Sequence, residues 1–152
     1  MANKDSAFGL RPIGKVGQNK DNQGLSEYSI AASATAIYQG DPVEMLATGT
    51  IGVAAAGDVL LGPLNGVFFT HASTSKPTFA NHLEASNTAT DIVGFVSDDP
   101  YERFEVQSNN TGASAQTDIG NVANIEYTAG SSPNYVSKVE LDDSDLATSD
   151  GQ

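Results

Sequence analysis

Short apolar runs, separated every few residues by glycine, proline, asparagine or aspartate, constrain this chain more than any other feature of its sequence. Apolar and polar residues alternate over residues 25–32, with Tyr28 and Ile30 on one face. Alternation of this kind is typical of a strand with one buried face. Helix formers such as leucine and lysine are scarce. The sequence therefore predicts an all-β domain, either a single β-barrel or a sandwich of short strands, with an extended N-terminal arm.

The strand pattern also predicts some pairings and some loops. The runs 59–61 and 67–69 are the most apolar and are predicted to lie in the core, with residues 62–66 between them. Residues 91–97 and 101–107 are predicted to form a hairpin, and the polar residues 70–87 a surface loop. Residues 118–124 fit one helical turn or a bulged strand. The other expected strands are residues 25–32, 34–38, 43–47, 51–55, 125–127 and 136–141.

The first 20 residues differ in charge from the remainder. Four of the seven basic residues stand there against the single acid Asp5, which gives about +3. The remaining residues hold three basic and eighteen acidic side chains, about −15. Such asymmetry is typical of a tail that binds a partner rather than packing on its own domain. We expect an extended arm and linker (1–24), a β-rich body (25–141) and an acidic tail (142–152); the alternative for the arm is a frayed terminus without a function.

Length and composition exclude several classes of protein. A chain of 152 residues can bury the core of one domain. The absence of cysteine excludes disulfides and thiolate metal sites. A pI near 4.2 argues against a nucleic-acid partner, because phosphate binding needs clustered lysine and arginine. No apolar run is long enough to predict a membrane span, and no leader predicts secretion.

Both histidines lie within the polar residues 70–87, so a metal site has to be considered there. His71 and His82, with Glu84 and Asp91 nearby in sequence, could together ligate one metal ion. Their spacing matches no zinc motif, and no cysteine supports such a site. We therefore expect surface or interface histidines, and no metal or cofactor.

Acidic side chains gather at two further places. Asp98, Asp99, Glu102 and Glu105 surround a turn, where a glycosidase could hold its catalytic pair. Such a pair needs one carboxyl in an apolar pocket, whereas Pro100 and the alternating polar face indicate exposure. The tail could bind a hard cation through its oxygens, but it lacks the glycine and glutamate of a calcium loop, so we expect it to be solvated. Its aspartates are Asp142, Asp143, Asp145 and Asp150.

The chain lacks the usual signatures of catalysis. No serine sits in a Gly-x-Ser-x-Gly elbow, and no glycine-rich loop carries a phosphate-binding lysine. Phe68, Phe69 and Phe79 could stack on a sugar or base, but core packing is the commoner use of such residues. By elimination, we expect a binding or structural module and not an enzyme.

Six motifs in a fixed order resemble one known family. The first is Ala7-Phe8-Gly9-Leu10-Arg11-Pro12, and the second is Ile37-Tyr38-Gln39-Gly40-Asp41-Pro42-Val43. The others lie at residues 62–69, 98–107, 118–121 and 139–142. Together they are similar to the capsid decoration (cement) proteins of tailed phages. The family often ends soon after the last motif, whereas this chain continues to Gln152.

The resemblance implies a β-rich structural protein without enzymatic activity. Such a protein is made in the host cytoplasm and binds the outer surface of the virion's capsid at capsomer junctions, where it stabilises the mature shell. Its partner is the major capsid protein, and its arm would fill surface grooves with apolar side chains. The capsid-contact residues that the resemblance implies are Phe8, Gly9, Leu10, Arg11, Pro12, Ile13 and Lys15.

The resemblance also implies self-assembly, with a trimer favoured over a dimer. Residues 67–69 could form the contact between subunits instead of core. The alternative function is a carbohydrate-binding or host-attachment module on the virion surface, which one exposed patch of Tyr101, Tyr127 and Tyr135 would favour. A third hypothesis is a metal-assisted hydrolase that uses His71, His82 and Asp91.

Overall fold

A computed structural model describes residues 5–17, 24–109, 113–144 and 146, and these form ten strands and one short 3₁₀ helix. The predicted all-β class is confirmed. In chain order the elements are β1 (Arg11–Lys15), β2 (Ser26–Ser29), β3 (Pro42–Met45), β4 (Ile51–Val53), β5 (Gly62–Thr70), β6 (Pro77–Ala80), β7 (Val93–Val96), β8 (Glu102–Glu105), η1 (Gln116–Asp118), β9 (Ile125–Glu126) and β10 (Glu140–Leu141).

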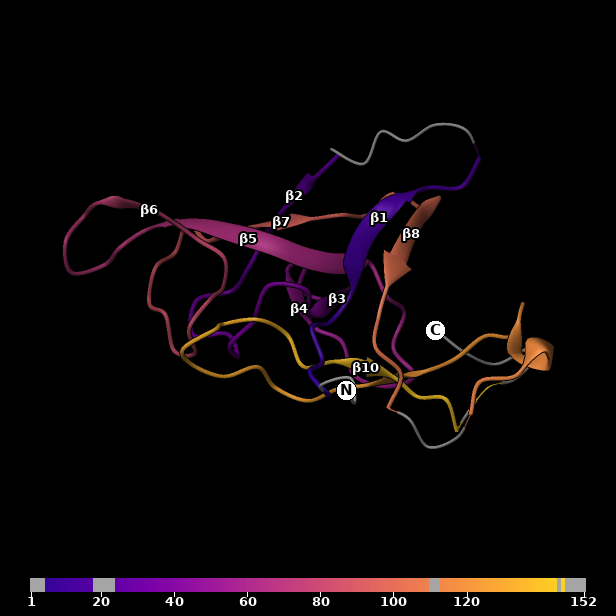
Figure 1. The fold of residues 1–152 in the computed structure, drawn as a ribbon. Helices are drawn as coiled ribbons and strands as arrows, with labels where there is room; N and C mark the ends of the chain where they lie inside the picture. The colour runs from indigo at the N-terminus through magenta and orange to yellow at the C-terminus, as the bar shows by residue number, and fades with distance from the viewer. Residues whose placement is uncertain (1–4, 18–23, 110–112, 145, 147–152) are drawn as a thin grey trace.

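A six-stranded antiparallel sheet forms the centre of the molecule. Its strand order is β2-β7-β5-β3-β4, and β6 pairs with the far end of β5 (Figure 1). β5 is the longest strand and pairs with β3, β6 and β7 along its length. Two two-stranded sheets, β1-β8 and β9-β10, lie beside it, and the sheets do not close into a barrel. Of the two predicted architectures, the arrangement is sandwich-like.

A bulge in β5 decides which of its side chains enter the core. Leu64 and Val67 are both buried although three positions separate them, which plain alternation forbids. The pairing with β7 shifts register between Leu64 and Gly66, so Asn65 is the extra residue. Opposite this point, a Cβ on Gly94 would lie 3.0–3.1 Å from side chains of the core. Glycine there lets three of them cross the sheet face: Ile30, Ile51 and Leu64.

The two most apolar runs differ in burial, which corrects one prediction. Val67 and Phe69 are buried in the core, as predicted. Val59 is 87% exposed, so the prediction that residues 59–61 lie in the core is wrong at its first position. Residues 62–66 are not a separator, because they form the first half of β5. With Val67 and Phe69 facing inward, only Phe68 of residues 67–69 remains for a contact between subunits.

Three predictions of local structure are also wrong. β7 and β8 do not form a hairpin: β7 pairs with β2 and β5, and β8 pairs with β1. Asp98 explains the change of direction, since it accepts hydrogen bonds from Ser26 Oγ (2.9 Å) and Tyr28 OH (2.6 Å) and so stays with β2. The predicted surface loop 70–87 contains β6. Residues 34–38 are not a strand and contribute a single bridge, Ile37 to Leu83.

Candidate functional site: a groove beside the N-terminal segment

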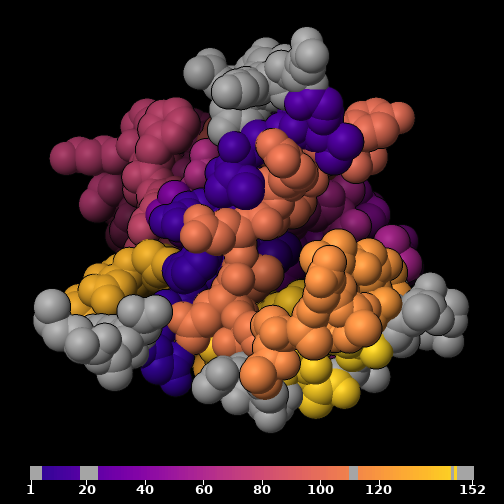
Figure 2. Space-filling view, turned by 45° about the vertical axis from the view of Figure 1, so that its right-hand side comes forward, coloured from indigo at the N-terminus to yellow at the C-terminus, as the bar shows by residue number. Residues whose placement is uncertain are grey.

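Residues 5–17, which we call the N-terminal segment, pack on the body. β1 pairs antiparallel with β8, with Arg11 opposite Glu105 and Lys15 opposite Glu102. Figure 2 shows the segment running over one face of the molecule, between the β8 region and the C-terminal residues. The expectation of an arm that does not pack on its own domain is therefore wrong for the described residues. The physical reason is that β8 offers a free edge to a segment whose own backbone is already extended.

A glycine lets the N-terminal segment lie close against the turn formed by residues 39–41. The Leu10 amide donates to the Gly40 carbonyl at 2.9 Å. Gly9 has a φ of +73°, and a Cβ there would lie 2.4 Å from the Gly40 oxygen and from Ser137 Cβ. Any other residue would therefore be strained and would collide with backbone. Gly9, which is also one of the expected capsid contacts, makes this internal approach possible.

The two cations of the N-terminal segment that the structure describes have partners within the chain. The Arg11 guanidinium binds the Glu105 carboxylate and also lies 4.9 Å from the centre of the Phe8 ring. Lys15 Nζ lies 2.6 Å from Asp99 Oδ2. The hydrogen bond from Lys15, together with the Tyr101 amide, holds the pKa of Asp99 below its usual value. Arg11 remains 61% exposed despite its partner, so its outer donors can still be reached by another molecule.

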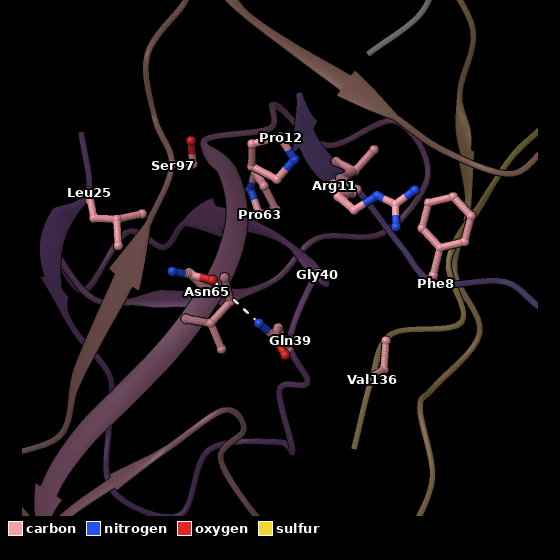
Figure 3. Close-up of a pocket in the computed structure, with 12 residues that line it drawn as sticks. Phe8, Arg11, Pro12, Leu25, Gln39, Gly40, Pro63, Asn65, Ser97 and Val136 are labelled. Carbon is pink, nitrogen blue, oxygen red and sulfur yellow. Dashed lines mark hydrogen bonds between the residues drawn. The ribbon is translucent and has the colours of Figure 1, made fainter. Parts of the chain in front are cut away.

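A groove of about 550 Å³ separates the N-terminal segment from the beginning of β5. Phe8, Arg11 and Pro12 stand on one side and Leu25 on the other, and Asn65 lies on the floor (Figure 3). The floor is polar at one point, where Gln39 Nε2 donates to Asn65 Oδ1 at 3.4 Å. The remaining lining residues are Leu10, Gly40, Pro63, Leu64, Ser97 and Val136. Apolar walls around a small polar floor suit an extended peptide with apolar side chains.

The structure brings four of the seven predicted contact residues into this groove: Phe8, Leu10, Arg11 and Pro12. Ile13 is the extra residue of a bulge in β1 and is exposed beyond the groove, and Lys15 is bound to Asp99. Sequence reasoning missed the contribution of the body, above all Leu25 and Asn65. The unexpected break of alternation between Leu64 and Val67 could have indicated the bulge that presents Asn65.

The residues considered in the third, metal-based hypothesis, His71, His82, Glu84 and Asp91, do not form one cluster among the described residues. His71 and His82 line a common cleft with Glu84, but the described residues contain no group of three or more side chains able to hold a metal ion. The His82 ring stacks on Tyr135 with 3.9 Å between centroids. Asp91 accepts the Thr70 amide at 3.0 Å, and hydrogen bonds from Thr70 lower the pKa of this carboxyl.

The acidic residues near the β7–β8 connection serve structural roles. Asp98 holds β2, Asp99 holds Lys15 and the Tyr101 amide, and Glu105 holds Arg11. Glu102 has one buried carboxylate oxygen without a hydrogen-bond partner in the described part of the chain. Asp98 and Asp99 line a common pocket with Leu25 and Tyr101, but each of the two carboxylates is bound to a different partner.

The beginning of the acidic tail folds back on the body. The Asp142 amide donates to the Asn124 carbonyl at 3.0 Å, and Asp143 accepts from Ser108. Hydrogen bonds from Ser144 lower the pKa of Asp142. Asp145 and Asp150 lie outside the described residues.

The three tyrosines proposed for sugar binding occupy different surroundings. Tyr101 is exposed at the end of β1, where its carbonyl accepts the Val16 amide. Tyr135 stacks on His82, and Tyr127 is partly buried. Burial raises the pKa of Tyr127 to about 12, with smaller contributions from Asp41 and Tyr38. The expected patch is therefore not formed.

A different set of aromatic rings, one exposed and two half-buried, gathers on β5, β6 and β7. Phe79 is 75% exposed, and its ring centre lies 4.7 Å from that of Phe68 and 6.5 Å from that of Phe95. Strand register explains the cluster, because Phe68 and Phe79 are directly paired on neighbouring strands. This aromatic face was not predicted, because residues 70–87 were expected to form a loop and not to contain β6.

One buried carboxyl belongs to Asp41, the residue that follows Gly40 of the groove lining. Asp41 is fully buried, and its Oδ2 accepts the Tyr38 amide at 2.8 Å. Its Oδ1 has no hydrogen-bond partner among the described residues. Burial raises the pKa of Asp41 to about 6, although the Ser137 hydroxyl and the Tyr38 amide act in the opposite direction.

Comparison with known proteins adds no relative to this description. No protein-family model matches the chain, and neither a curated protein nor a solved structure matches it significantly. The described part of the chain also contains no helix with the length and apolarity needed to cross a membrane.

Proposed function

We propose that this protein is a structural component of a phage virion, one that binds the outer surface of the capsid at capsomer junctions and stabilises the mature shell. The groove beside the N-terminal segment is its binding site for the major capsid protein. In this proposal the protein acts on the virion surface as an oligomer, with a trimer favoured over a dimer, and it performs no catalysis.

The observation that carries the proposal is the position of the opening motif. Residues of Ala7-Phe8-Gly9-Leu10-Arg11-Pro12 line the groove, and side chains from the body complete it. The groove offers apolar walls, two amide side chains and an exposed arginine, which together can hold an extended backbone with apolar side chains and a carboxylate. Many copies on one shell would add avidity to a modest single contact.

Co-sedimentation with undecorated capsids tests the proposal. Deleting residues 1–20 would also remove β1, so side-chain changes give the cleaner experiment. The double variant Phe8→Ala/Leu25→Ser alters both walls of the groove and keeps the strands. Ile119→Ser is the matched control, because Ile119 is an exposed apolar residue outside the groove.

We expect wild type and Ile119→Ser to bind saturably and the groove variant to lose at least tenfold in affinity. Equal binding by all three would move the contact away from the groove. Failure of the wild type to bind any capsid preparation would overturn the capsid function itself. Circular dichroism on each variant verifies that the fold is retained.

The second candidate function is a carbohydrate-binding or host-attachment module, and the exposed ring of Phe79, with the half-buried rings of Phe68 and Phe95 beside it, favours it. Flat aromatic surfaces stack on sugar rings. A glycan array with wild type and Phe79→Ala tests this candidate. Binding that Phe79→Ala abolishes would support it, whereas no binding by the wild type would remove it.

A further inference from the structure

Three segments of the chain meet at the turn formed by residues 39–41. The Gly40 carbonyl accepts the Leu10 amide of the N-terminal segment, and the Gln39 carbonyl accepts the Ser137 amide at 2.9 Å. β5 is bound twice, because the Leu64 amide donates to the Asp41 carbonyl and the Leu64 carbonyl accepts the Gly40 amide. The turn is therefore the place where the N-terminal segment, the main sheet and the C-terminal residues are joined.

The carboxyl of Asp41 lies at the centre of this junction. Ser137 lies beside it and also accepts the Val139 amide at 3.1 Å through its hydroxyl. Gly9 packs on the other side of Ser137, where even a Cβ would not fit. Gly9 of the N-terminal segment therefore packs against Ser137, and Ser137 in turn lies beside the buried carboxyl of Asp41.

We propose that Asp41 is a proton-operated lock on the N-terminal segment: when the carboxyl is uncharged the junction closes, and when it is ionised the docking of residues 5–17 on the turn is weakened. This proposal concerns the chain alone and does not depend on what the groove binds.

The physical reason is the uneven strength of the contacts around the carboxyl. A buried carboxylate with an unpartnered oxygen is costly, and admitting water to it relieves the cost. The main sheet cannot move to admit water without opening the core that contains Leu64 and Val67. The N-terminal segment is joined to the turn itself by one backbone hydrogen bond, from the Leu10 amide to the Gly40 carbonyl, while the β1–β8 ladder and the Arg11–Glu105 pair hold it to β8. Its docking on the turn therefore depends on fewer contacts than that of β5, which makes two backbone hydrogen bonds with the turn and packs in the core. The raised pKa of Asp41 agrees with this geometry, because it places ionisation in a range that solution pH reaches readily.

Few other ionisable groups face this carboxyl. Tyr127 interacts with it from the chain that follows β9, and Tyr38 lies in the same turn. His82 stacks on Tyr38 one ring further away, and Lys138 next to Ser137 is exposed. The parts of β5 and of the N-terminal segment that touch the turn, Leu64, Gly9 and Leu10, carry no ionisable side chain. A pH response at this junction therefore reports Asp41, and a variant without the His82 ring serves as a control.

The sign of the effect follows from the raised pKa. The closed junction binds the proton more tightly than an open one, so closing is favoured below the ordinary value of 3.8 and weakened as pH rises to about 6. The equilibrium constant for local opening should rise by up to about tenfold per pH unit across this window and then level off.

Amide hydrogen exchange on the full chain between pH 4 and pH 8 tests the lock. The Leu10 amide reports the N-terminal segment and the amides of β5 report the core, after correction for the intrinsic pH dependence of exchange. Asp41→Asn is the test variant. Asp58→Asn is a matched control, because Asp58 Oδ2 accepts the amide three residues earlier at 2.8 Å as Asp41 does, but in an exposed turn. His82→Gln removes the neighbouring imidazole.

We expect opening at Leu10 to increase with pH in wild type, Asp58→Asn and His82→Gln, and to be independent of pH in Asp41→Asn, while β5 stays protected throughout. An unchanged profile in Asp41→Asn would overturn the lock, and so would a wild-type Leu10 amide whose opening does not vary with pH. If Asp41→Asn does not fold, the wild-type data still decide, because a parallel response of Leu10 and β5 would mean global loosening and would also overturn the lock.

Discussion

The β5–β7 pair and the β1–β8 pair are both antiparallel, yet they are held together by different forces. β5 and β7 meet over the core, where Leu64, Val67 and Val96 are buried. β1 and β8 meet at the surface, where Arg11 binds Glu105 and a bulge interrupts the register. Burial of apolar area stabilises the first pair and hardly responds to salt or pH. The second pair depends on backbone hydrogen bonds and screened charges, so the two regions should respond to different perturbations.

The largest expected effect separates buried from exposed apolar side chains. Leu64→Ala leaves a cavity under the main sheet and should lower the free energy of unfolding by about 2–5 kcal/mol. Val59→Ala removes an exposed side chain and should change it by less than about 0.5 kcal/mol. Chemical denaturation of both variants measures the difference. Equal losses would mean that Val59 contributes to a core after all.

Ionisation of Asp41 should change the free energy of unfolding by a comparable amount. Its raised pKa means that the folded state binds the proton more tightly, so the contribution of Asp41 to stability is complete below about pH 4 and is lost as pH rises to about 6. The shift corresponds to a loss of up to about 3 kcal/mol over that window. Denaturation at several pH values should show this decline in wild type and not in Asp41→Asn. The lowered pKa values of Asp91, Asp99 and Asp142 act below their ordinary value of 3.8, outside this window.

A pair of glycine variants sharpens the comparison within the N-terminal segment. Gly9→Ala introduces a Cβ that overlaps Gly40 and Ser137, at a φ of +73°. Gly17→Ala has a similar φ of +92° but open space around it. Positive φ alone costs about 1–2 kcal/mol, so an additional loss in Gly9→Ala measures the overlap. Protease sensitivity of the N-terminal segment should increase strongly in Gly9→Ala and only slightly in Gly17→Ala.

The smallest expected effect concerns the exposed ion pair. Arg11→Gln should cost about 0–1 kcal/mol, because Arg11 and Glu105 are largely exposed and solvent screens their attraction. Added salt should weaken protection of β1 in wild type and have little effect in Arg11→Gln. Hydrogen exchange at low and high salt provides the measurement. A loss of several kcal/mol would show that the β1–β8 pairing depends on the Arg11–Glu105 ion pair more than the exposure of the two side chains suggests.

The fold class could be predicted because it follows from local patterns. Alternation over residues 25–32 and the apolar run within residues 91–97 predict two strands, and the structure has β2 and β7 there. Whether an apolar run is buried or exposed cannot be predicted from its local sequence. Val59 and Val67 begin runs of similar composition, and only tertiary packing makes one exposed and the other buried.

Of the residues that line the candidate site, only those of the N-terminal segment were predicted from the sequence. Phe8, Leu10, Arg11 and Pro12 could be named because motif and charge mark them. Their partner strand could not, since no local signal links β1 to β8 across most of the chain. The sequence does not distinguish the turn residue Asp41 from Asp58. Each carboxylate accepts a hydrogen bond from the backbone amide three residues earlier. Only the surrounding segments make Asp41 buried and its pKa unusual.

The pairing of β1 with β8 has a consequence for the order in which the molecule forms. Arg11 and its partner Glu105 are 94 positions apart, and a ribosome makes the chain from its N-terminus. The strands of the main sheet, β2 to β7, are complete before β8 leaves the ribosome. The first strand to be synthesised is therefore among the last to be paired, and closing so long a loop makes its docking a late step of folding.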